Sequence, residues 1–358
     1  MLFNRPRLEL LELIRRGAAP GELAYGALEL ERRGWELDCT DDGFRPGLVS
    51  RAWSRLAEDR FSQRGVRVGF NVPQAWRLRD RLAAADAIFA TGDAAALGAL
   101  AVMRSLQIDT PLLAGSIGLA AGLAQRPGRV VQSISGSLLR RARCVVCYSQ
   151  TERASLIERL GLDPRNVHFV RFGVDLGRHK PADPVADGPA LAFGNDRRRD
   201  WPTLLRALEG YSGPVRLVTY PEFVRGLALP PNVEYIPGPI PFAKLDRLLE
   251  QARMVILPIV PNDYTAAQIS LLYSLARAKA VIVSRTAPLE SGYGVVHERH
   301  ALLVEPGNAQ SLARAVERLD RDPSLRRDLG AAGRALVEDG LHLERYADEL
   351  GALLERML

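Results

Sequence analysis

The chain has 358 residues, and its 48 lysines and arginines against 42 aspartates and glutamates give a formal net charge of +6. With 47% hydrophobic and 25% charged residues it can bury a large core, which excludes a mainly disordered protein. Two domains are favoured, since single cores stop growing at about 250–300 residues. Three cysteines exclude a disulfide framework, and the basic excess favours anionic partners.

In the first half, short apolar runs alternate with helical stretches. One run contains Cys144 and Cys147, but its continuous hydrophobicity predicts a buried strand rather than a redox or zinc site. The predicted strands are 35–38, 86–91, 111–114, 144–148 and 168–172, and the predicted helices are 8–16, 21–34, 94–106, 131–143 and 151–160.

A segment with two prolines and two glycines, 176–188, predicts a linker. A second alternating set follows it, and the whole pattern predicts an α/β fold with two doubly wound Rossmann-like domains and a ligand-binding cleft between them. The predicted domains are 1–177 for the acceptor, linker 178–188, 189–340 for the nucleotide, and a helix 341–358 that we expect to pack back on the first domain.

The elements expected in the second half follow the same order of strand and helix. The predicted strands are 191–193, 215–219, 233–236, 254–257, 280–284 and 301–304, and the predicted helices are 201–209, 242–252, 267–277, 310–319 and 325–358.

Residues 45–81 combine nine arginines with three acids, and they include several aromatic side chains. This composition favours contact with an anionic membrane surface or with an acceptor that carries a phosphate; the alternative is a solvated arginine-rich face. The first residues show no signal-peptide pattern, and no apolar run is long enough to span a membrane. We expect a cytoplasmic protein that can work at the inner face of the membrane.

Four segments carry motifs in an order that points to one family. They are VHFVRFGVD (167–175), LAFGNDRRRDWPTLL (191–205), QISLLYSLARAKAVIVS (268–284) and LLVEPGN (302–308). Together they resemble the GT-B glycosyltransferases, in particular family 4 (glycosyl transferases group 1) and its relatives, over roughly residues 80–350. The resemblance implies the two-domain GT-B fold.

The resemblance also implies an activity: a hexosyltransferase-like enzyme that moves a sugar from a UDP- or GDP-sugar to an acceptor. We expect a lipid-linked or cell-surface polysaccharide precursor as the acceptor, and neither a permanently bound cofactor nor a metal. His297 and His300 have metal-like spacing, but Arg299 between them argues against a metal.

The sequence departs from the family at several site positions. The family's pair of glutamates, which frames the sugar and ribose, is replaced by Thr265 and Tyr273. Asn195 takes the place of the loop arginine, and the family's lysine falls near Arg198 or Arg199. These departures leave open how much catalytic activity remains.

Residues 197–199 are consecutive arginines directly after a predicted strand, and guanidinium groups suit phosphate oxygens. The run from Thr265 to Gln268, which opens the predicted helix 267–277, adds backbone N–H groups that favour an anion. The alternatives are a solvated charge run and an ordinary helix start. The predicted donor-diphosphate residues are Asn195, Arg198, Arg199, Thr265, Ala267 and Gln268.

The turn PGPIP at 237–241 is expected, from its position in the family, to meet the nucleotide base. There the backbone of Ile240 would read the base edge, and Pro239 and Tyr273 complete the predicted base and ribose site. A Pro-Gly-Pro sequence is equally well explained as a simple turn.

Asp93 follows the predicted strand 86–91 and is the first candidate for a catalytic base. Capping the next helix is the rival explanation. If the reaction retains configuration, a side-chain base is unnecessary. On the acceptor side we also expect Asp42 and Ser116, the latter where the family often has histidine.

Two other functions stay open. The loss of the family's carboxylates is what a catalytically degenerate scaffold or partner subunit would show. A nucleotide-sugar epimerase on the same fold is a further alternative, but no acid–base pair near the sugar is evident. Nucleic acid is not an expected partner, since no recognition motif accompanies the basic charge.

Overall fold

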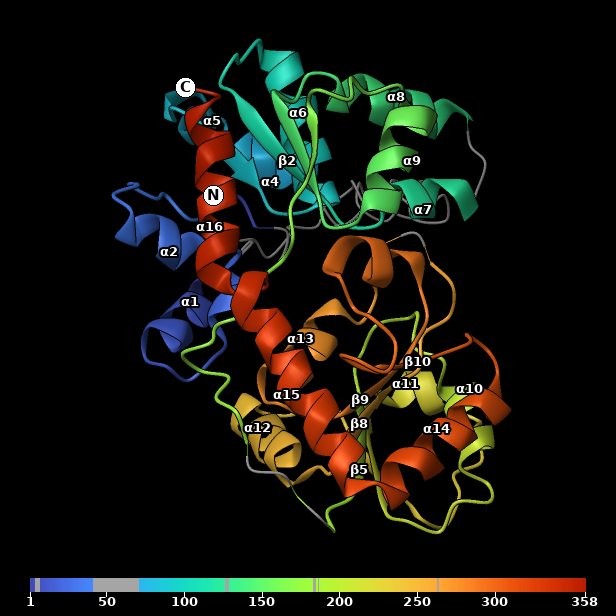
Figure 1. Ribbon diagram of the computed structural model, residues 1–358. Coiled ribbons are helices and arrows are strands. Elements are labelled where there is room, and N and C mark those ends of the chain that lie inside the picture. Colours follow the sequence, from blue (N-terminus) through green and yellow to red (C-terminus); the bar gives the residue numbers. More distant parts are fainter. Residues whose placement is uncertain (4–6, 41–70, 126–128, 183–184, 186, 263) are drawn as a thin grey trace. The chain divides into compact units, whose positions relative to one another are not determined.

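The computed structural model describes residues 1–3, 7–40, 71–125, 129–182, 185, 187–262 and 264–358. The chain has an α/β fold and divides into two compact units (Figure 1). Unit 1 consists of Met1–Arg16, Leu23–Arg171 and Tyr346–Leu358, and unit 2 of Gly17–Glu22 and Phe172–Arg345. The exact predicted domain boundaries and the predicted cleft stay predictions.

Unit 1 contains a parallel sheet whose described strands follow one another in chain order. They are β1 (Ile88–Ala90), β2 (Leu112–Ser116), β3 (Cys144–Cys147) and β4 (Val167–Phe169). Beyond β1, Leu2 forms single bridges with Ala90 and with Thr40. All strands run the same way, so their carboxyl ends share one edge of the sheet.

Helices connect and flank these strands, as expected for a parallel sheet. The predicted strand 35–38 is wrong, because this stretch is largely exposed and only the following Thr40 pairs. The helices in this part of the chain are α1 (Leu8–Arg15), α2 (Ala27–Arg32), α4 (Asn71–Arg77), α5 (Arg79–Ala84), α6 (Asp93–Leu106), α7 (Leu119–Gln125), α8 (Arg129–Leu139), α9 (Gln150–Leu160) and α16 (Leu343–Glu355), with a 3₁₀ turn η1 (Gly21–Ala24).

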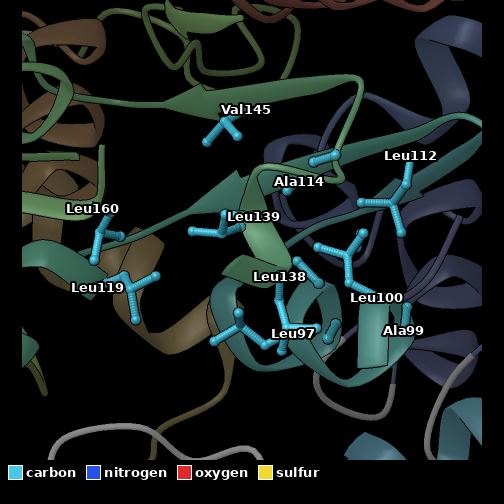
Figure 2. Packing of buried hydrophobic residues seen from close by; sticks show 14 of the residues in the cluster. Leu97, Ala99, Leu100, Leu112, Ala114, Leu119, Leu138, Leu139, Val145 and Leu160 are labelled. Atoms are coloured by element: carbon cyan, nitrogen blue, oxygen red, sulfur yellow. The ribbon is translucent and has the colours of Figure 1, made fainter. Parts of the chain in front are cut away.

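The core of unit 1 lies between the sheet and the helices packed on it, with α6 and α8 among them (Figure 2). Leu97 and Leu100 of α6 are buried with Leu112 and Val145 of the strands. Alanines at several buried positions of α6 allow this helix to pack closely on the sheet. Cys144 and Cys147 are free thiols inside β3, and both are buried, so the prediction of a buried strand is confirmed.

Unit 2 contains a six-stranded parallel sheet in the order β10-β9-β8-β5-β6-β7. The chain starts in the middle at β5, moves outward through β6 and β7, and returns to β8 on the other side of β5. The gap between the ends of β5 and β8 is therefore the topological switch point, where such sheets bind ligands. The strands are β5 (Ala190–Phe193), β6 (Val215–Thr219), β7 (Val233–Pro237), β8 (Met254–Leu257), β9 (Val281–Ser284) and β10 (Leu302–Val304).

The helices of unit 2 cover its sheet and pack apolar faces against it. Trp201 and Leu204 of α10 and Val316 of α14 are almost fully buried in this core. No helix among the described residues is long and apolar enough to cross a membrane. The helices are α10 (Trp201–Ala207), α11 (Pro221–Val224), α12 (Phe242–Gln251), α13 (Gln268–Ala276), α14 (Ala309–Arg321) and α15 (Pro323–Gly340), with a short helical turn η2 (Pro288–Gly292).

Candidate functional site

The arginine-rich loop follows β5 and lies at the switch point of unit 2. Arg199 forms an isolated antiparallel bridge with Ile259, in the segment that follows β8. The Val260 N–H donates to the Arg198 carbonyl at 2.9 Å, and the Asp200 N–H donates to the Pro258 carbonyl at 3.0 Å. Backbone pairing thus holds the loop against the second segment that borders the crevice.

The three consecutive arginines have different environments. Arg197 is exposed, Arg198 is half-buried, and Arg199 is buried with 7% of its surface exposed. Arg199 Nη2 donates to the Ser270 hydroxyl at 2.6 Å, whereas Nε and Nη1 are buried and have no hydrogen-bond partner among the described residues. Burial lowers the pKa of Arg199 to about 10, so this side chain remains a cation at neutral pH.

Gly194 makes room for this guanidinium. Its φ is +141°, in a region that favours glycine, and a Cβ at this position would collide with Nη2, Cζ and Nε of Arg199. The conformation of one glycine and the position of one arginine therefore depend on each other.

The amino end of α13 supplies the second part of this site. Ser270, the partner of Arg199, lies in the first turn of the helix. Ala267, the residue before α13, has a left-handed φ of 61°, which is costly for a residue other than glycine. The first turn of a helix presents backbone N–H groups and the positive end of its dipole, so an anion here would meet both these groups and Arg199.

The other predicted donor residues lie around this point. Thr265 and Ala267 are buried just before α13, and Asn195 is exposed in the loop after β5. The Gln268 side chain donates to the hydroxyl of Tyr293, which also accepts the Phe172 N–H at 3.1 Å. The Gln268 N–H also donates to the Thr265 carbonyl at 3.4 Å, so the diphosphate-binding role of Gln268 stays a prediction.

Asp196 is the acid on this loop. Its Oδ1 accepts the Arg198 N–H at 2.7 Å and the Tyr264 hydroxyl at 3.2 Å. The carboxylate thus orders the loop and the segment after β8, and Arg199 is left without a salt bridge among the described residues.

Tyr273, predicted to contact the ribose, lies in a buried network. Its ring is 4.2 Å from that of His179, and burial, together with the charge of the nearby Glu22, raises the pKa of Tyr273. Glu22 Oε1 also lies 3.0 Å from His179 Nε2. Tyr273 is thus buried within unit 2, and its ribose-binding role stays a prediction.

The turn predicted to meet the base follows β7, the edge strand of the sheet. Pro239 is exposed and Ile240 is half-buried. Strands β5 and β6 separate β7 from β8, so this turn belongs to a different part of the sheet edge from the segment after β8. Its base-binding role also stays a prediction.

In unit 1, Asp93 and Ser116 lie at the carboxyl ends of neighbouring strands. Asp93 is the first residue of α6, and its Oδ2 accepts the Ile117 N–H at 3.1 Å instead of capping the helix. Ser116 ends β2, and its hydroxyl donates at 2.8 Å to Oε1 of Glu152, which follows β3. The side chains therefore meet where three consecutive strands end.

Glu152 was missed by the sequence analysis. It is 1% exposed, and its Oε1 accepts the Gly118 N–H at 2.6 Å. The available signal was the spacing of Ser149 and Glu152, typical of a helix start; the Ser149 hydroxyl does accept the Glu152 N–H, at 3.3 Å. Burial raises the pKa of Asp93 to about 6; burial and the charge of Asp93 raise that of Glu152 to about 8.

The remaining candidates are Asp42, the basic window 45–81 and the histidines His297 and His300. Asp42 and residues 45–70 of the basic window lie outside the described residues, and within 71–81 the side chain of Trp76 is exposed. His297 Nδ1 accepts the Leu303 N–H at 3.0 Å, and His300 Nδ1 accepts the Val296 N–H at 3.1 Å. These rings order the connection between β9 and β10.

Comparisons with known proteins agree with this arrangement. Residues 27–178 match the family model Glycosyltransferase Family 4, and residues 214–322 match the family model Glycosyl transferases group 1. A search of the curated proteins finds no match.

Three solved structures illustrate the likeness in fold. Sucrose-phosphate synthase from Thermosynechococcus elongatus has 22% identity and a TM-score of 0.66, over 80% of this chain and 78% of that one. HepE from Anabaena in complex with UDP-glucose has 14% identity and a TM-score of 0.67, over 79% and 82%. A UDP-forming α,α-trehalose-phosphate synthase from Burkholderia xenovorans, in complex with glucose-6-phosphate, has 12% identity and a TM-score of 0.63, over 79% and 76%.

The two parallel sheets, the two family models in their order along the chain, and these structural neighbours lead to one conclusion. The predicted α/β fold with two Rossmann-like domains is confirmed. The chain belongs to the GT-B glycosyltransferases of family 4 (glycosyl transferases group 1) and their relatives.

Proposed function

We propose that the protein transfers a sugar from a nucleotide diphosphate sugar to an acceptor, and that unit 2 binds the donor diphosphate at Arg199. The observation that carries this proposal is the buried guanidinium of Arg199, with two N–H-bearing nitrogens that lack partners among the described residues. Leaving a buried charge without partners is costly, so such a group is well suited to receive an anion.

The charge of this site suits a diphosphate. Arg199 and the amino end of α13 lie together at the switch point, and Gly194 leaves room for the guanidinium. When the bond between the sugar and the diphosphate breaks, negative charge grows on the leaving oxygen, and fixed cations and N–H groups stabilise it. No metal is needed for this step in the proposal, because the chain supplies the positive charge itself.

Structural neighbours support the class of donor and acceptor. HepE has been crystallised with UDP and with UDP-glucose, and the trehalose-phosphate synthase with glucose-6-phosphate. For this chain we infer a UDP-sugar or GDP-sugar donor for a hexosyl group, with the base at Pro239 and Ile240. The acceptor is a glycan or a lipid-linked precursor of a cell-surface polysaccharide, which the enzyme reaches from the cytoplasm through residues 45–81.

Unit 1 would receive the acceptor at the ends of its strands. If the reaction inverts the anomeric carbon, Asp93 is the base for the acceptor hydroxyl. Its raised pKa of about 6 allows it to accept a proton while remaining mostly ionised at neutral pH. Ser116 and Asp42 complete the proposed acceptor side.

The first test is donor binding, measured by calorimetry. The purified protein is titrated with UDP, GDP and ADP, and with inorganic pyrophosphate as a probe of the phosphate contacts alone. We expect one nucleoside diphosphate to bind more tightly than the others and than pyrophosphate. Absence of binding by every nucleoside diphosphate would contradict the proposal.

A second candidate function is a catalytically degenerate partner subunit. Thr265 and Tyr273 replace the family's two glutamates, and Tyr273 is buried beside the ring of His179. Donor hydrolysis and transfer to a panel of sugar acceptors separate the two functions. A protein that binds the nucleotide but neither hydrolyses nor transfers any donor sugar would favour the subunit.

A further inference from the structure

A hollow of about 490 Å³ opens at the edge of the unit 1 sheet where β2 and β3 begin. The turns 109–111 and 140–143, which precede these strands, contribute to its lining. Asp93 and Ser116 lie at the other edge, where the strands end, and the two ends of β2 are roughly 13 Å apart at about 3.3 Å per residue. All lining residues belong to unit 1. The hollow is therefore separate from the proposed acceptor side and from the donor site in unit 2.

The lining residues of this hollow divide by exposure into an apolar and a polar group. The buried ones are apolar, and they include Leu100 and Met103 of α6 and Met357, which follows α16. The exposed ones are polar, and they include Arg141 and Arg143. The hollow thus has an apolar floor and a charged rim, and its volume lies within the range of about 300–1,000 Å³ that is typical of small-molecule sites.

Three arginines and one aspartate supply the charge of the rim. Arg140 is held in place, because its Nη1 donates at 2.8 Å to the carbonyl of Leu160, the last residue of α9. The side chains of Arg141 and Arg143 form no hydrogen bond or ion pair among the described residues, although Asp109 lines the same hollow. An excess of two positive charges therefore lines the hollow without an ion pair there.

The helix dipole offers another explanation of the basic rim. Arg140 and Arg141 directly follow α8, and basic residues near a helix C-terminus stabilise the helix. This effect falls off beyond the last turn, so it does not account for Arg143, which stands directly before β3. It also does not account for the hollow beneath the arginines.

The charge and the floor together define the chemistry of a ligand. Guanidinium groups pair well with the oxygens of phosphates and carboxylates. A phosphate monoester carries about −1.5 to −2 charges at pH 7, which matches the excess of two, whereas a single carboxylate would leave positive charge over. The exposed amide of Asn166 at the rim can donate a further hydrogen bond. The apolar floor favours a ligand whose phosphate carries a small apolar group.

We propose that this hollow binds a phosphate monoester that carries an apolar group. The phosphate lies between Arg141 and Arg143 at the rim, and the apolar group contacts Met103 and Met357 on the floor. The source of this group is a soluble phosphate ester or a lipid headgroup, which share this chemistry. The site does not depend on the proposed function, because its residues belong neither to the proposed donor site nor to the acceptor side.

Methyl NMR reports on the hollow directly, because the chain has four methionines and two of them line it. Met103 and Met357 are the reporters, and Met254, buried in β8 of unit 2, is the internal control. The protein, labelled with ¹³C at the methionine methyl groups, is titrated with phenyl phosphate. We expect both reporter signals to shift along one saturating curve while that of Met254 stays in place. Unchanged reporter signals at millimolar phenyl phosphate would overturn the proposal.

The role of the rim is tested with the double variant Arg141→Ala, Arg143→Ala. We expect it to bind phenyl phosphate roughly 10-fold more weakly or less, because two charged contacts are lost. Arg16→Ala is the matched control, since Arg16 is an exposed arginine of unit 1 that directly follows helix α1 and lies outside the hollow. This control should bind as the wild type does. Equal affinities of the double variant and the wild type would refute the site.

Two further titrations test the floor and the independence of the site. Inorganic phosphate should bind several-fold more weakly than phenyl phosphate; equal affinities would contradict the role of the floor. Arg199→Ala should leave the titration of Met103 and Met357 unchanged, whether or not the protein binds a nucleotide. A loss of these shifts in Arg199→Ala would mean that the reporters respond to the donor site, and the proposal would fail.

Vesicle flotation distinguishes the two sources of the phosphate. The vesicles consist of phosphatidylcholine, with and without phosphatidic acid, whose headgroup is a phosphate monoester. If the double variant loses the binding that depends on phosphatidic acid and Arg16→Ala keeps it, the ligand is a lipid headgroup. If the double variant floats as the wild type does while its affinity for phenyl phosphate is reduced, the ligand is a soluble phosphate ester.

Discussion

The two units place opposite charges at the same kind of position, the carboxyl ends of parallel strands. Unit 2 buries the cation of Arg199 without an anion, and unit 1 places the half-buried Asp93 near the buried Glu152 without a cation. An arginine cannot lose its proton near neutral pH, so it needs an external anion to be satisfied. A pair of acids can share a proton and needs no ligand. Under the proposed function, the donor supplies the anion that unit 2 lacks, whereas a shared proton lowers the charge of the acid pair in unit 1.

The largest expected effect is the loss of the unit 2 cation. Arg199→Ala should weaken nucleotide diphosphate binding by about 3 kcal/mol, or roughly 100-fold, because charged hydrogen bonds contribute most here. Arg197→Ala, an exposed neighbour, is the control and should change the affinity little. Calorimetry with the best-binding nucleotide measures both. Equal losses in the two variants would mean that the arginines act only as a diffuse positive charge.

The next prediction concerns Gly194, which leaves space for the Arg199 guanidinium. Gly194→Ala should destabilise unit 2 by about 2 kcal/mol or more, because the new Cβ collides with the guanidinium and the φ disfavours alanine. Gly307→Ala controls for φ alone, since Gly307 has a φ of +74° with nothing within 4 Å of the added Cβ. Urea unfolding followed by the fluorescence of Trp201 measures the difference. If both variants lose the same stability, the collision does not contribute to the loss.

The pH dependence of unit 1 stability tests the acid pair, the other half of the comparison. Both acids have a raised pKa in the folded state, so their contribution to stability is full below about pH 4 and is lost as the pH rises through about 6 and then about 8. Unit 1 should therefore be less stable at pH 9 than at pH 5. Asp93→Asn should reduce this loss. Hydrogen exchange of β1 and β2, corrected for its intrinsic pH dependence, measures it; unit 1 stability that rises over this range would contradict the prediction.

The smallest effect concerns Tyr273. Tyr273→Phe removes a buried hydroxyl close to the charge of Glu22 and should lower the stability of unit 2 by about 1 kcal/mol. Thermal unfolding measures this change, and calorimetry of the same variant shows whether the hydroxyl contacts the ribose. A variant as stable as the wild type would mean that the hydroxyl contributes no net stability.

The sequence was sufficient for the fold, because alternating apolar runs and amphipathic stretches predict a parallel sheet locally. It pointed to the arginine loop, but not to which arginine is buried, since this depends on Gly194 and on pairing with the segment after β8. The role of Glu152 could not be predicted from the sequence, because its partner Ser116 lies 36 residues away. Likewise, Glu22 and His179 are 157 residues apart. Such contacts follow from the folded topology rather than from any local pattern.

Unit 1 includes the residues Tyr346–Leu358, although all of unit 2 except Gly17–Glu22 precedes them directly in the chain. The Tyr346 hydroxyl lies 3.1 Å from that of Tyr148, and Asp348 accepts from Arg33 at 2.7 Å. During synthesis on the ribosome, the first-made unit must therefore wait, with part of its apolar surface uncovered, until the second has been translated. During synthesis, unit 1 should therefore bind chaperones more strongly than unit 2 does.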